Sequence, residues 1–175
     1  DFTGKAGTTT TLLGITEIKT PRILLVGLGT AESLSLASLE KAMTTAARSI
    51  SSKPKTNIIV ALPEVDNSVL SAEQLATVAS TSMIVGAVGQ DLYRAEAAHS
   101  PFQTITIAGT GDTAASQQAV DRGRILGESI NLAREMGNRH AGDIFPVSFA
   151  DRVVEVAKST GLEAEILDEK QLKQE

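Results

Sequence analysis

Two hydrophobic periods alternate along the chain. Short runs in which apolar residues are continuous, or fill every second position, predict β-strands. These runs are Thr11 to Ile18, Arg22 to Val26, Thr56 to Leu62, Phe102 to Ala108 and Leu162 to Leu167. Between them, apolar residues recur three and four positions apart, which predicts helices with one apolar face. We expect these helices over residues 36–50, 72–86, 114–136 and 146–160.

Local signals mark several helix ends. Ser71 and Gln74 form a capping-box pattern, in which each side chain bonds the other residue's backbone amide, so a helix is expected to begin after Ser71. Pro54 is expected to end the first helix, because the residue before a proline resists helical backbone angles. Pro146 suits a first helical position, and Gly161 is expected to end the helix that Pro146 opens.

This order of strands and helices predicts an α/β layered fold with a central, largely parallel sheet flanked by helices. The polar stretch 136–144 is the internal boundary that we expect. It divides the chain into an N-terminal α/β domain, residues 1–137, and a connecting helix and strand, residues 138–175. In the helix 114–136, the small residues Ala119 and Gly123 predict close packing on one face.

Composition narrows the classes of function. The 175 residues are 42% hydrophobic, which is typical of a globular domain and excludes disorder. The net charge is −5 without a basic run, so we expect no nucleic-acid binding. Apolar runs are far shorter than a membrane span, and no signal peptide is visible. The absence of cysteine excludes disulfides and thiol nucleophiles. Because the sequence starts at Asp1 without Met, we expect it to be a piece of a longer protein.

Two turns that contain glycine suggest the hypothesis of a nucleotide-binding site. Gly27-Leu28-Gly29 follows an apolar strand, but a dinucleotide fingerprint needs a third glycine where Glu32 stands. Gly109-Thr110-Gly111 lacks the lysine and hydroxyl residue that end a phosphate loop. We interpret both as tight turns.

The polar residues form no recognisable catalytic motif. His99 and His140 are far apart and lack second ligands at helical spacing, and no serine lies in a Gly-x-Ser-x-Gly elbow. The remaining candidates are carboxylates that we interpret as helix-start and surface charges: Asp143, Asp151, Asp168 and Glu169. We therefore assign no catalytic, cofactor-binding or metal-binding residue.

Residues 131–146 resemble the interdomain signature of the leucyl (cytosol) aminopeptidases, Asn-Leu-x-Arg-x-Leu-x-Asn-x-Pro-x-Asn-x-x-x-Pro. The matching positions are Asn131, Leu132, Arg134, Asn138 and Pro146, with Met136 in place of leucine, His140 in place of proline and Gly142 in place of asparagine. Residues 22–29, the Tyr93-Arg94 pair and residues 163–170 resemble further family elements in the same order.

The resemblance implies an accessory N-terminal domain of macro-type fold in a metal-dependent leucyl aminopeptidase, which removes N-terminal residues, leucine above all, from peptides. Two divalent ions, manganese or zinc, would lie in a C-terminal catalytic domain that follows Glu175, held by lysine, aspartate and glutamate ligands that this chain does not contain. The resemblance also implies a cytoplasmic homohexamer, in which this domain serves assembly and access to the interior and is itself inactive.

Two other functions remain open from the residues. One is a free-standing macro-type module that binds a nucleotide or ADP-ribose through the Gly27 or Gly109 turn. The other is a DNA-binding regulatory domain, which the net charge of −5 disfavours.

Overall fold

The computed structural model describes residues 1–54, 57–64, 70–109, 111 and 113–174. Its chain divides into two compact units, Asp1–Ala133 and Arg134–Glu175. Thr56, Thr110 and Asp112, which belong to the strand and the loop expected above, lie outside the described residues. Each unit is described by itself.

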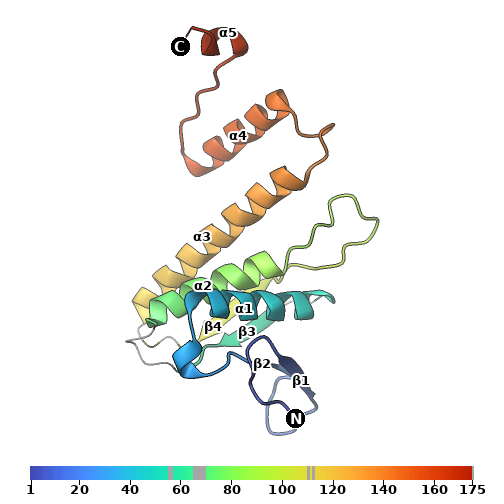
Figure 1. Cartoon of the computed structure of the whole chain (residues 1–175), viewed down its shortest axis with the longest axis vertical. Coiled ribbons are helices and arrows are strands. Elements are labelled where there is room, and N and C mark those ends of the chain that lie inside the picture. The colour runs from blue at the N-terminus through green and yellow to red at the C-terminus, as the bar shows by residue number, and fades with distance from the viewer. Residues whose placement is uncertain (55–56, 65–69, 110, 112, 175) are drawn as a thin grey trace. The chain divides into compact units, whose positions relative to one another are not determined.

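The first unit contains both kinds of element in the order that the sequence predicts, apart from one added turn of 3-10 helix (Figure 1). The elements are β1 (Thr9–Leu13), β2 (Arg22–Val26), η1 (Ala31–Ser33), α1 (Leu36–Ser51), β3 (Asn57–Ala61), α2 (Ala72–Gly86), β4 (Thr104–Ala108) and α3 (Thr113–Asn138), whose last residues belong to the second unit. It is therefore a mixed α/β domain.

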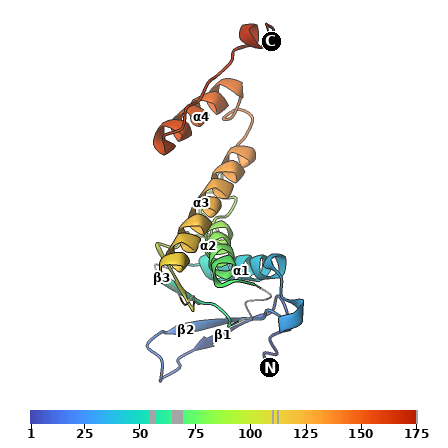
Figure 2. The ribbon, with the colours of Figure 1, turned by 90° about the vertical axis from the view of Figure 1, so that its left-hand side faces the viewer.

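The prediction of a single central sheet is wrong for the described residues, which form two sheets of two strands each. β1 and β2 make an antiparallel hairpin, in which Thr9 lies opposite Val26 (Figure 2). β3 and β4 are parallel, as expected. The apolar run in β2 predicts burial on both faces of a parallel sheet, but β2 pairs with its neighbour in sequence and is half-buried. An apolar run does not specify the partner of a strand, because strand pairing is decided by the rest of the fold.

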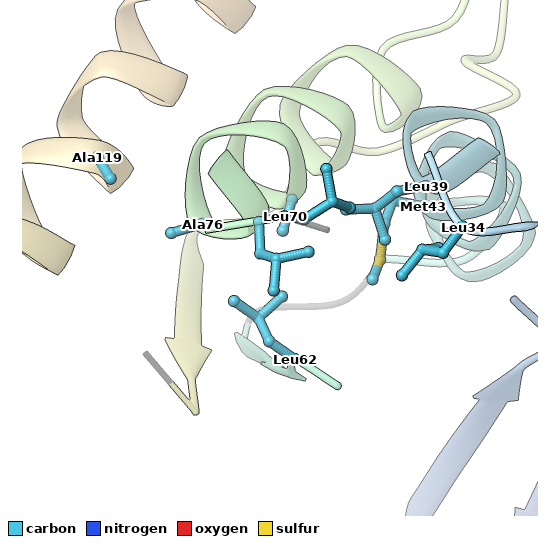
Figure 3. Packing of buried hydrophobic residues seen from close by; sticks show 9 residues of the cluster. Leu34, Leu39, Met43, Leu62, Leu70, Ala76 and Ala119 are labelled. Atoms are coloured by element: carbon cyan, nitrogen blue, oxygen red, sulfur yellow. The ribbon is translucent and has the colours of Figure 1, made fainter. Parts of the chain in front are cut away.

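The core of the first unit lies between α1, α2 and one face of the β3–β4 sheet (Figure 3). On β3, Ile58 and Val60 are half-buried while Ile59, one position away, is 76% exposed, so the strand has one covered and one open face. The buried apolar cluster consists of Leu34, Leu39, Met43, Leu62, Leu70, Leu75, Ala76, Ala79 and Ala119.

Helix ends follow the predicted signals. The Ser71 amide donates to Gln74 Oε1 at 2.9 Å, and the Gln74 amide donates to Ser71 Oγ at 3.2 Å, which confirms the capping box of α2. Helix α1 ends at Ser51, shortly before Pro54, as expected.

The predicted strand 11–18 is wrong beyond Leu13, because the chain turns there and the Ile18 amide donates to Ile15 O.

The second unit contains the end of α3, α4 (Pro146–Thr160) and α5 (Glu169–Leu172). Pro146 is the first residue of α4, and Gly161, at φ 74°, ends it, as predicted. The predicted strand Leu162–Leu167 is not formed. These residues run between α4 and α5 without a paired strand in the described part of the chain, and a strand needs such a partner for its backbone hydrogen bonds.

Candidate functional site

The backbone amides of Gly27 and Gly29 donate hydrogen bonds to carbonyl groups of this chain. Gly27 N–H donates to Thr8 O at 2.8 Å, and Gly29 N–H donates to Gly4 O at 3.0 Å, where Gly29 has a φ of 82°. A phosphate loop works through amides that are free to reach the anion. Since both glycine amides are already bonded, the interpretation of this segment as a tight turn is supported.

A negative charge stands beside the same turn. The pKa of Glu32 is lowered, because its carboxylate accepts hydrogen bonds from its own backbone amide and from the Thr30 hydroxyl. Glu32 is therefore ionised at neutral pH. An ionised carboxylate next to the turn repels a phosphate group, which further disfavours a nucleotide at this place.

Gly109 follows β4 and has a φ of 94°. A Cβ on this residue would also lie 3.2 Å from the carbonyl oxygen of Leu62. Both the backbone angle and the close approach of Leu62 require glycine, so its presence is explained without a ligand.

The two histidines lie in different units and have different surroundings. His99 N–H donates to Asp91 Oδ2 at 3.2 Å in the loop between α2 and β4, and His99 Nδ1 is buried without a hydrogen-bond partner. His140 Nδ1 accepts the Gly142 amide at 3.0 Å. No group of three histidine, aspartate or glutamate side chains that could hold a metal ion occurs among the described residues.

Hydroxyl side chains join α2 to α3 within the first unit. Thr77 Oγ1 donates to Ala119 O at 3.1 Å, Ser80 Oγ donates to Val120 O at 3.0 Å, and Thr81 Oγ1 donates to Gly123 O at 3.0 Å. We call these three pairs the hydroxyl ladder. The prediction that the small residues of α3 allow close packing is confirmed, because a Cβ on Gly123 would lie 2.7 Å from the Cβ of Ser80. The spacing of these hydroxyl residues, three and four positions apart, is a helical-face pattern that is visible in the sequence, but it does not identify the facing helix.

Asn131, the first residue of the signature segment, has a structural role. Its Nδ2 donates to the carbonyl oxygen of Ile84 at 3.2 Å. Ile84 is in the last turn of α2, where carbonyl groups lack a partner in the helix. Asn131 therefore satisfies a carbonyl at the end of α2.

From Arg134 onward the signature segment belongs to the second unit, and polar contacts hold it there. Glu135 Oε1 accepts from Arg139 Nε at 3.2 Å, and Glu135 Oε2 lies 4.0 Å from Arg152 of α4. Ser148 Oγ donates to Asp143 O at 3.0 Å and accepts the Phe145 amide at 2.9 Å. These contacts fix the turn between α3 and α4.

The predicted surface carboxylates are exposed, and one of them begins a helix. Asp168 accepts the amides of Lys170 and Gln171 at 2.9 and 2.8 Å and caps α5, as expected. Asp143, Asp151 and Glu169 are exposed.

Through the described ranges, no helix is both long and apolar enough to cross a membrane.

Comparisons with known proteins agree with one another. A sequence model of the cytosol aminopeptidase family, N-terminal domain, matches residues 1–100. A probable cytosol aminopeptidase of Rhodopirellula baltica is 33% identical over 179 residues, which cover 100% of this chain and 32% of the relative. One of Solibacter usitatus is 31% identical over 168 residues, covering 96% of this chain and 34% of the relative.

Solved structures give the same result. A mutant of tomato leucine aminopeptidase matches with a TM-score of 0.83 and 27% identity, over 99% of this chain and 34% of that one. The bottromycin maturation enzyme BotP, in complex with Mn, matches with a TM-score of 0.81 and 25% identity, over 99% of this chain and 35% of that one. The chain thus spans about one third of the length of these relatives.

Proposed function

Because this chain belongs to the cytosol aminopeptidase family and is homologous to its N-terminal domain, we propose that it is the accessory N-terminal part of a metal-dependent leucyl aminopeptidase. The observation that carries the proposal is the match of almost the whole chain to one third of relatives named cytosol aminopeptidase. In this account the longer protein removes N-terminal residues, leucine above all, from peptides, and these 175 residues alone are inactive.

The metal ions of the proposed enzyme belong to its catalytic domain. The described residues of this chain do not fit a metal ion, since they include no suitable group of three side chains. The Mn in the BotP structure supports manganese for the longer protein, with zinc as the other candidate. Two bound divalent ions would activate a water molecule and polarise the scissile carbonyl. This chain takes no part in that step.

The role of this chain is structural in the proposed account. Residues 1–137 form the N-terminal domain, which we assign to the macro-type fold, and residues 138–175 connect it to the catalytic domain. The polar contacts around Glu135 and Ser148 support a connection of defined shape, because they hold the turn between α3 and α4. The domain would serve assembly of a homohexamer and access to its interior. A cytoplasmic location agrees with the names of the relatives.

The experiment compares the longer protein with the 175-residue chain on a leucyl substrate with added manganese. We expect hydrolysis by the longer protein and none by the 175-residue chain. Equal hydrolysis by both would place the active site within these residues. No hydrolysis by either, with peptides of other N-terminal residues also intact, would contradict the proposal.

Neither alternative function is favoured by an observation. The donors of the Gly27 turn are bonded within the chain, and Glu32 adds a negative charge beside them. The net charge of −5 opposes binding to a phosphate backbone.

A further inference from the structure

The connection between α2 and β4, residues 87–103, is a long loop without a helix or strand of its own (Figure 1). Loops of more than about 12–15 residues are uncommon in compact domains and are most often functional. Residues 92–98 of this loop are exposed, and Leu92 and Tyr93 are 43% and 62% exposed. The contacts that hold the loop therefore decide how firmly these two side chains are positioned.

The carboxylate of Asp91 joins the two ends of the exposed part of this loop. Its Oδ2 accepts the His99 amide at 3.2 Å, and its Oδ1 lies 3.6 Å from Arg94 Nε. The Arg94 amide also donates to Asp91 O at 3.1 Å. One position further along, the Ser100 amide donates to Ser51 O of α1 at 2.8 Å. A single side chain, that of Asp91, thus closes the base of the loop.

The imidazole ring of His99 lies beside the same carboxylate. Its Nδ1 is buried without a hydrogen-bond partner among the described residues. Nδ1 and the Asp91 carboxylate approach Gly89 from the same side, because a Cβ on Gly89 would meet both groups, with Nδ1 at 3.0 Å. Buried polar atoms are nearly always hydrogen-bonded, so an unbonded nitrogen next to a carboxylate needs a physical reason.

The protonation state of the ring decides whether Nδ1 can bond Asp91. In a neutral ring, an Nδ1 without a hydrogen is an acceptor, and a carboxylate is an acceptor as well, so the two do not pair. Histidine gains its second ring proton at about pH 6.5, where aspartate is still ionised. Nδ1–H of the charged ring can then donate to the carboxylate, and such charge-assisted hydrogen bonds are stronger than neutral ones.

The surrounding charges favour the protonated ring. Gly89 lies three residues beyond Gly86, the last residue of α2, and the C-terminal end of a helix attracts cations. Arg94 opposes a second positive charge, but its side chain is 65% exposed, so water screens this repulsion. From α1, the carbonyl group of Ser51 faces the loop through its bond to the Ser100 amide. Protonation of the ring therefore strengthens the closed loop.

We propose that Asp91 and His99 form a pH-sensitive clasp, which closes the loop between α2 and β4 more firmly as His99 takes up a proton. In the closed state, Asp91 accepts both the backbone amide and Nδ1–H of His99, and Leu92 and Tyr93 are held in one position. At higher pH the amide bond remains without this second donor, so the loop opens more readily. The clasp uses only residues of this chain and is independent of the proposed function.

Hydrogen exchange followed by NMR in the 175-residue chain tests the clasp. The probe is the His99 amide, whose protection factor is measured at about pH 7.5 and about pH 5.5. We expect about tenfold greater protection at the lower pH, which is the effect of one added hydrogen bond between charged groups. The amides of β3 and β4 report the stability of the whole unit and serve as the reference. Equal protection at both pH values, or weaker protection at the lower one, would overturn the proposal.

His99→Gln is the direct variant, because glutamine keeps a polar side chain but gains no proton in this pH range. The rise in protection should be absent from this variant. His140→Gln is the matched control, since it removes the other of the two histidines, which lies in the second unit, and it should keep the rise. A rise that persists in His99→Gln, or one that disappears in His140→Gln alone, would overturn the proposal.

Asp91→Asn tests the acceptor of the clasp. An uncharged amide oxygen is a weaker acceptor than a carboxylate, so protection of the His99 amide should be lower at both pH values and should no longer rise. Protected amides in β4 show that the variant is folded. An undiminished rise in Asp91→Asn would mean that the proton on His99 acts through another group, and the clasp would be wrong.

Discussion

Gly123 of α3 lies directly against Thr77 of α2: a Cβ on Gly123 would come 2.5 Å from the Thr77 carbonyl oxygen. No side chain fits at this distance unless the two helices move apart. The hydroxyl ladder spans the same contact, so a displacement of α3 would also stretch hydrogen bonds such as that of Thr81 Oγ1 to Gly123 O. Close packing and hydrogen bonding are thus coupled at one position.

The first prediction concerns this contact. Gly123→Leu should overpack the α2–α3 face and lower the free energy of unfolding by about 1–3 kcal/mol. Gly137 is the matched control, because it lies in the same helix and a Cβ at this position would have open space within 4 Å. Gly137→Ala should leave stability unchanged or raise it by up to about 1 kcal/mol. Thermal unfolding of both variants is the measurement, and an unchanged midpoint in Gly123→Leu would contradict the packing.

The second prediction concerns the start of α2. Ser71→Ala removes the acceptor for the Gln74 amide and should lower the unfolding free energy by about 1 kcal/mol. Ser71→Asp keeps an acceptor and should restore most of the loss. Denaturant titration measures both variants. Equal stability of the Ala and Asp variants would show that the cap contributes nothing.

The third prediction concerns the ion pairs that Arg152 makes with Glu135 and Glu155. Arg152→Ala removes the contact with Glu135 at 4.0 Å and the closer pair with Glu155 at 2.9 Å. The substitution should lower the unfolding free energy by less than about 1 kcal/mol, because all three side chains are partly exposed to water. The effect should shrink in about 1 M salt, which screens exposed charges. Lys173→Ala removes a far more exposed pair with Glu169 and serves as the control. An effect of Arg152→Ala that does not change with salt would assign Arg152 a packing role instead.

The fourth prediction is that ADP-ribose does not bind. Calorimetric titration should give no saturable heat, since the amides of Gly27 and Gly29 are bonded to Thr8 and Gly4. Saturable binding that is lost in Gly29→Val would contradict this prediction and favour a nucleotide-binding module.

Sequence reasoning succeeded where structure is decided locally. The capping box at Ser71 and the left-handed Gly161 are set by residues within one helical turn, so their positions can be predicted from a few neighbours. The close packing at Gly123 could also be predicted, because small residues on one helical face permit it. The hydroxyl ladder was missed, since a sequence does not tell which helix faces Thr77.

Failures came where a distant partner decides the structure. Alternation predicts a strand at 162–167, but it does not show whether another strand lies beside it. The same limit explains why the apolar run of β2 predicts a parallel sheet, whereas β2 pairs with β1 in an antiparallel hairpin. As for the candidate site, the signature segment indicated the family, while the bond of Asn131 to Ile84 required the folded arrangement of α2 and α3.

In the proposed function, these residues are the accessory part of a metal-dependent aminopeptidase. The most direct measurement is the rate of leucyl-substrate hydrolysis by the longer protein after its metal ions are removed with a chelator and manganese is returned. The account predicts that activity is lost on removal and regained with manganese. Undiminished hydrolysis by the metal-free protein would contradict it.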